Sequence, residues 1–147
     1  MGRVELKMSE RGGAGAERAH AVNRAYLAAA RALDVVSLFP GFCQLTSDAT
    51  SAYTQAFLKG TPTWVALPRE RWPPGWEGKY TNPVVPLVLN LYGHPDAGGW
   101  WEEECIRRLK DLGWEEIEGW SSVFLHRATG SLLVVYVDDF TMACPTK

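Results

Sequence analysis

The chain has 147 residues, enough for one domain with its own core. Apolar residues make up 46% and charged residues 22%, the balance of an ordinary globular protein. The net charge of −2 argues against the broad basic surface of a stand-alone nucleic-acid-binding protein. Cys43, Cys105 and Cys144 form neither a CxxC pair nor a zinc pattern. We therefore expect free thiols in a reducing, intracellular compartment, cytoplasmic or nuclear.

The amino-terminal part predicts a leader followed by a long helix. Residues 1–15 are polar and glycine-rich, which predicts a disordered leader and no signal peptide. Residues 16–38 are rich in alanine and carry apolar side chains at every third or fourth position, which predicts a helix with one core-facing side. Arg24, Arg31 and Asp34 interrupt its apolar character, so we expect no membrane span.

The middle of the chain alternates short apolar runs with segments rich in proline and glycine. The apolar runs predict short strands over 42–47, 63–68 and 87–91. Residues 48–60 predict a turn or short helix. Residues 69–86 predict an irregular loop, because prolines and glycines recur through them.

Beyond residue 97 the pattern changes to a helix followed by closely spaced strands. Apolar side chains at helical spacing predict a helix over 98–112, which Gly113 ends. Four strands are then predicted, over 114–117, 121–127, 132–137 and 140–143. Taken together, these elements predict an α+β fold in which an antiparallel sheet carries two long helices packed on one face.

Two adjacent aspartates, Asp138 and Asp139, separate the last two predicted strands. The β-branched Val134 and Val135 before them fit a strand that is covered on both faces. Aspartate is unfavourable inside strands and common in turns, so the pair predicts the tip of a tight hairpin. Neighbouring carboxylates repel each other, and Mg²⁺ or Mn²⁺ would relieve that repulsion through hard oxygen ligands. The alternative is a solvated turn without a ligand.

The hairpin sequence Tyr136-Val137-Asp138-Asp139 resembles the catalytic hairpin of reverse transcriptases, in particular those of copia-type long-terminal-repeat retrotransposons. Asp48, with Tyr53 five positions later, is similar to the first motif of that family. Two further segments follow in the family's order. They are 67–76, which is similar to its Pro-Pro-Gly segment, and 91–101, which is similar to its Leu-Tyr-Gly motif.

The resemblance implies a palm-like domain over residues 16–147 that transfers nucleotides with two Mg²⁺ or Mn²⁺ ions. Asp48, Asp138 and Asp139 would be its catalytic residues and metal ligands. Asp48 and Asp138, from two neighbouring strands, would be the main ligands, and Asp139 would support the metal on the primer side. From the residues alone, Asp48 could equally be a helix cap. The implied partners of an active chain are an RNA or DNA template–primer and a deoxynucleoside triphosphate, with no membrane involved.

Three further positions are implied to bind nucleotide. Tyr53 would lie under the sugar of the incoming nucleotide, and Tyr136 would pack on the primer end. Asp96 stands where the family has glutamine, and Gly99 where it has arginine. Considered without the resemblance, both tyrosines could be core aromatics.

The resemblance is incomplete at both ends. The basic fingers segment of the family has no clear counterpart before residue 42, and the thumb and ribonuclease H segments are expected to be absent. We therefore expect a partial reverse transcriptase domain that is inactive by itself. The alternative is a non-catalytic, domesticated interaction module with a palm-like fold.

Overall fold

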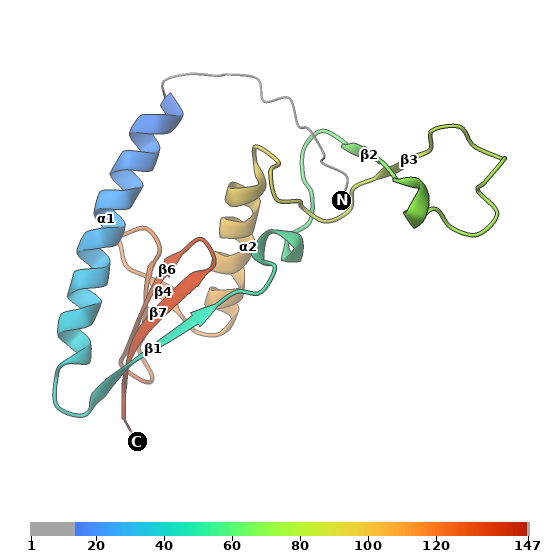
Figure 1. The fold of residues 1–147 in the computed structure, drawn as a ribbon. Coiled ribbons are helices and arrows are strands. Elements are labelled where there is room, and N and C mark those ends of the chain that lie inside the picture. Colours follow the sequence, from blue (N-terminus) through green and yellow to red (C-terminus); the bar gives the residue numbers. More distant parts are fainter. Residues whose placement is uncertain (1–13, 147) are drawn as a thin grey trace.

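The computed structural model describes residues 14–146, with side chains from residue 26 onward. Its main body is a five-stranded antiparallel sheet with one long helix on each side (Figure 1). The helices are α1 (Ala14–Ser37) and α2 (Ala97–Asp111). The strands run in the spatial order β1-β7-β6-β5-β4. Their bounds are Phe42–Asp48 for β1, Glu115–Glu116 for β4, Val123–His126 for β5, Ser131–Tyr136 for β6 and Asp139–Pro145 for β7.

The class of fold is as predicted, with mixed helices and strands and an antiparallel sheet. The predicted leader falls mostly on residues 1–13, which lie outside the described part of the chain. Its last two residues are instead helical, because α1 begins at Ala14. Neither α1 nor α2, the two long helices of residues 14–146, has the length and hydropathy to cross a membrane.

The segment that lies between β1 and α2 in the sequence forms a two-stranded extension, which projects from the main body (Figure 1). It pairs β2 (Trp64–Ala66) with β3 (Val84–Pro86), and it includes the short 3-10 helix η2 (Arg69–Arg71). The strand predicted over 87–91 is replaced by β3, which starts earlier. The position of β3 follows the register of its partner, because β2 aligns with 84–86 and the Leu87 N–H donates to the Thr63 carbonyl in the same register. Phe57 and Leu89 form only an isolated bridge, in a different register.

The two long helices cover opposite faces of the sheet, so the prediction that both pack on one face is wrong. One hydrophobic core joins α2 to one face of the sheet, and a second hydrophobic core joins α1 to the opposite face. The α2 core contains Trp101, Cys105, Leu109, Phe124, Leu133 and Val135, and the α1 core contains Ala29, Leu33, Val123, Val134 and Ala143. Successive residues of β6 thus alternate between two cores. The continuous apolar sequence of β6 is typical of a strand that is covered on both faces, and here the two cores cover its two faces.

Candidate functional site

The β6–β7 hairpin has a two-residue tip, Val137 and Asp138, because Tyr136 pairs with Asp139 across it. The predicted tip, Asp138 and Asp139, is therefore displaced by one residue. Val137 has a φ of 57°, a left-handed conformation that is unfavourable for a β-branched residue. Two hydrogen bonds hold this tip. The indole N–H of Trp101 donates to the Val137 carbonyl at 2.6 Å, and the backbone N–H of Ala49 donates to the Asp138 carbonyl at 2.7 Å.

Asp48 and Asp139 lie directly opposite each other on β1 and β7. The next pair along the two strands, Ala49 and Asp138, is hydrogen-bonded through the backbone, so Asp48 and Asp139 occupy a non-hydrogen-bonded position. Opposed side chains are closest at such positions. Both aspartates are exposed, and they line an open hollow of about 450 Å³ beside Tyr26 of α1. This acidic pair, Asp48 and Asp139, is the strongest candidate for a cation site.

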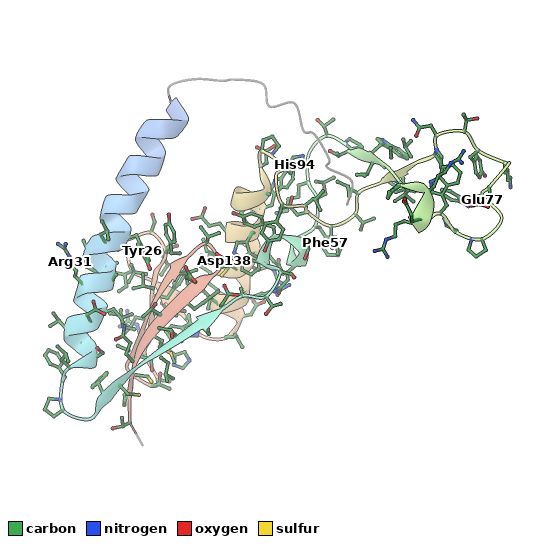
Figure 2. All side chains as sticks on the ribbon, viewed as in Figure 1. Tyr26, Arg31, Phe57, Glu77, His94 and Asp138 are labelled. Carbon is green, nitrogen blue, oxygen red and sulfur yellow. The ribbon has the colours of Figure 1, made fainter. Side chains whose placement is uncertain are left out.

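Asp138 is placed differently from the acidic pair. It lies at the tip of the hairpin (Figure 2) and does not line the hollow beside Asp48 and Asp139. Burial, together with the negative charge of Asp138 and the proximity of Tyr92, raises the pKa of Tyr53, so Asp138 lies close enough to Tyr53 to act on it. Within the described residues, no three His, Cys, Asp or Glu side chains come close enough together to hold a metal ion.

The tyrosines predicted to contact nucleotide each pack against another aromatic ring. Tyr53, in the 3-10 helix η1 (Ala52–Gln55), has its ring centroid 4.6 Å from that of Tyr92. Tyr136 has its ring centroid 4.4 Å from that of Tyr26 on α1. Asp96 immediately precedes α2, is exposed, and lines neither the hollow nor the cavity described below. The ring contacts of Tyr53 and Tyr136 fit the alternative that both tyrosines are core aromatics.

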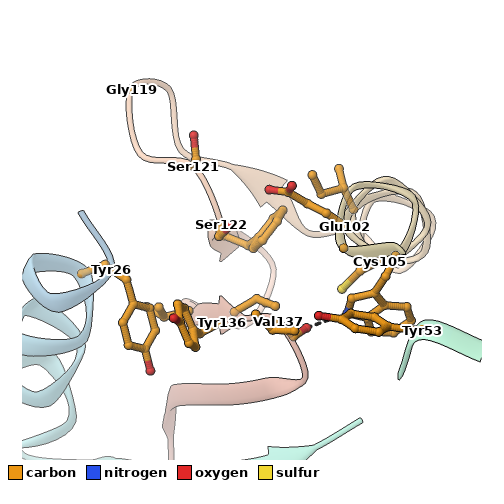
Figure 3. Close-up of a pocket in the computed structure, with 16 residues that line it drawn as sticks. Tyr26, Tyr53, Glu102, Cys105, Gly119, Ser121, Ser122, Tyr136 and Val137 are labelled. Atoms are coloured by element: carbon orange, nitrogen blue, oxygen red, sulfur yellow. Dashed lines mark hydrogen bonds between the residues drawn. The ribbon is translucent and has the colours of Figure 1, made fainter. Parts of the chain in front are cut away.

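Sequence reasoning missed a second cavity, of about 500 Å³, between the two helices and the hairpin (Figure 3). Tyr26 and Tyr136 border it on the α1 side, and Tyr53 and Cys105 border it on the α2 side. Burial raises the pKa of the Cys105 thiol to about 11, so this thiol is not a reactive group at neutral pH. No sequence pattern signals the cavity, because its walls come from separate segments of the chain.

Sequence reasoning also missed Arg108, which ties α2 to the segment that follows β1. Its guanidinium donates to the Gln55 side chain at 2.7 Å and to the Gln55 backbone carbonyl at 3.3 Å. It also pairs with Glu104. Hydrogen bonds from Arg107 and Arg108 lower the pKa of Glu104 to about 2. Arg108 thereby positions η1, and with it Tyr53, against α2.

Replacing Val137 with glycine should raise the free energy of unfolding by up to about 1.5 kcal/mol. Glycine removes a left-handed penalty of about 1–2 kcal/mol and adds an entropic cost of about 0.5–1 kcal/mol. Urea denaturation would measure the change. The matched control is Val88→Gly, because Val88 is also exposed but has no positive φ. That variant should lose stability, and an equal loss in Val137→Gly would contradict the strained tip.

No family model, no curated protein and no solved structure matches this chain. The site offers two opposed carboxylates on one face, a third at a constrained tip, and an aromatic-lined cavity beside them. Carboxylates in this arrangement can bind a divalent cation, which is the chemistry that can be tested first.

Proposed function

We propose that the acidic pair binds Mg²⁺ or Mn²⁺ and is the metal site of a domain similar to the palm of copia-type reverse transcriptases. The observation that carries the proposal is the direct pairing of Asp48 with Asp139, from strands that lie far apart in the sequence. Like charges directly opposite each other destabilise a sheet, and a bound cation converts this repulsion into attraction. Mg²⁺ in particular is usually held by one or two carboxylates, with water and substrate phosphates as its other ligands.

The three aspartates have separate parts in this proposal. Asp48 and Asp139 would hold the cation, and Asp138, one residue away at the tip, would add a further carboxylate when nucleotide binds. Held by these residues, the cation would supply activation of a hydroxyl nucleophile and stabilisation of the charge that develops on the phosphate. The substrates would be a template–primer and a deoxynucleoside triphosphate, with Tyr53 and Tyr136 near the nucleotide and the primer end.

Mg²⁺ or Mn²⁺ should raise the melting temperature of the chain, and the double variant Asp48→Asn, Asp139→Asn should abolish that response. At a hundredfold excess over its Kd, a bound ion stabilises the folded state by about 2.7 kcal/mol. Without metal, the double variant should melt above the wild type, because removing opposed like charges contributes about 0.2–1 kcal/mol. Differential scanning calorimetry with and without the ion measures both effects.

The control is Glu77→Gln, which removes one negative charge at the far end of the two-stranded extension that contains β2 and β3 (Figure 2). Its metal response should equal that of the wild type. A response that persists in the double variant would place the cation elsewhere and end the proposal. Asp138→Asn provides a further comparison: it should weaken the response less than either Asp48→Asn or Asp139→Asn, because Asp138 does not line the hollow.

A specific observation favours the second candidate function, a non-catalytic interaction module. Helix α1 lies on the same face of the sheet as the acidic pair, and its Tyr26 borders the hollow and packs on Tyr136. A template–primer approaching that face would meet α1, and the net charge of −2 offers little attraction to a phosphate backbone. Magnesium-dependent primer extension that the double variant lacks would establish the enzyme. Ion binding without extension would favour the interaction module.

A further inference from the structure

Two of the three cysteines lie face to face, although 101 positions separate them in the sequence. Cys43 on β1 and Cys144 on β7 are directly opposite in the strand register, and their Sγ atoms are 3.6 Å apart. Both residues are half-buried, so a small reagent has access to the sulfurs. The sequence predicted three free thiols, and its spacing did not indicate that two of them would be neighbours.

We propose that Cys43 and Cys144 are a redox-responsive pair that closes to an intramolecular disulfide in the presence of a low-molecular-weight disulfide. The backbone geometry suits the bond. In the same register, the Thr146 N–H donates to the Gly41 carbonyl at 2.7 Å, so the cysteines, two residues farther along each strand, occupy a hydrogen-bonded position. Such positions have Cα atoms about 5.5 Å apart, which is the common separation in disulfides. The sulfurs need to approach by only about 1.5 Å.

The reaction is a two-electron thiol–disulfide exchange, with oxidised glutathione as the oxidant. One cysteine thiolate attacks a glutathione sulfur, which forms a mixed disulfide and releases one glutathione thiolate. The second cysteine thiolate then attacks the protein sulfur of the mixed disulfide, forms the Cys43–Cys144 bond and releases the second glutathione thiolate. The two protons lost by the cysteines are taken up by the two released thiolates. The cysteines are thereby oxidised and the glutathione is reduced.

The bond would join β1, an edge strand of the described sheet, to its neighbour β7. In the described sheet β1 pairs with β7 alone, and most of its side chains are exposed. A covalent link between these strands would close a long loop of the unfolded chain and would prevent β1 from separating. It would also hold the register of the strands that carry Asp48 and Asp139. The proposal does not depend on the cation site, because it concerns only the two thiols and the strand pairing.

The test is to equilibrate the purified chain with mixtures of reduced and oxidised glutathione and to analyse it by mass spectrometry without reduction. We expect a monomer that has lost two hydrogens, a cross-linked peptide containing Cys43 and Cys144, and full reversal by dithiothreitol. The oxidised chain should melt roughly 5–15 °C higher than the reduced chain. The variants Cys43→Ser and Cys144→Ser should lose both the cross-link and the shift in melting temperature.

Cys105→Ser is the matched control, because Cys105 is buried in the α2 core and takes no part in the pair. It should form the cross-link as the wild type does. Peptide mapping of the wild-type chain makes the test independent of how well any variant folds. A stable mixed disulfide with glutathione, a disulfide-linked dimer, or a cross-link that involves Cys105 would each overturn the proposal.

Discussion

Replacing Trp101 with alanine should lower the free energy of unfolding by about 3–5 kcal/mol. Trp101 is 4% exposed and packs with Phe124 and Val135 in the α2 core. The substitution opens a cavity in that core and also removes the hydrogen bond to the Val137 carbonyl, which then lacks its partner at the hairpin tip. Urea denaturation followed by circular dichroism would measure the loss.

Two companion variants separate the causes. Trp100→Ala changes the neighbouring residue, which is only half-buried and packs against His94, so its cost should be much smaller. Trp101→Phe keeps most of the apolar volume but removes the indole donor, and it should cost about 1–3 kcal/mol. Equal losses in Trp100→Ala and Trp101→Ala would show that Trp101 does not support the hairpin in the way described.

Replacing Leu33 with alanine should lower the free energy of unfolding by about 2–5 kcal/mol. Leu33 is 0% exposed and fixes α1 to the sheet against Val134 and Ala143. The same substitution at Leu27, which lies on the same helix but is 54% exposed, should change stability by no more than about 0.5 kcal/mol. Thermal or urea unfolding of the two variants under identical conditions makes the comparison.

Leu33→Ala and Leu27→Ala together test whether α1 packs on the sheet. That packing is the observation that favours the interaction module over the enzyme. Helix α1 lies on the face that carries the acidic pair, and Leu33 is the most deeply buried of its described side chains. If Leu33→Ala costs no more than Leu27→Ala, then α1 does not pack on the sheet as described. In that case the second candidate function loses the observation that favours it.

The elements of this protein were largely predictable from local sequence patterns. The alanine-rich stripe predicted α1, the apolar spacing before Gly113 predicted α2, and the strands near the carboxyl terminus follow short apolar runs. Each of these signals lies within one element, since a helix or strand reveals its buried side in its own periodicity. The hairpin between β6 and β7 was predicted for the same reason, and its tip was displaced by one residue because cross-strand pairing sets the turn.

Only the tertiary structure decided which residues meet across the chain. The antiparallel register of β1 against β7 sets Asp48 opposite Asp139 and places Cys43 opposite Cys144. Nothing in the sequence of either strand specifies that register, because pairing depends on which partner each strand finds and on which face it buries. The sequences of the helices likewise do not specify which face of the sheet each helix covers. The apolar run of β6 requires cover on both faces, but which helix takes each face is decided by the packing of the whole chain.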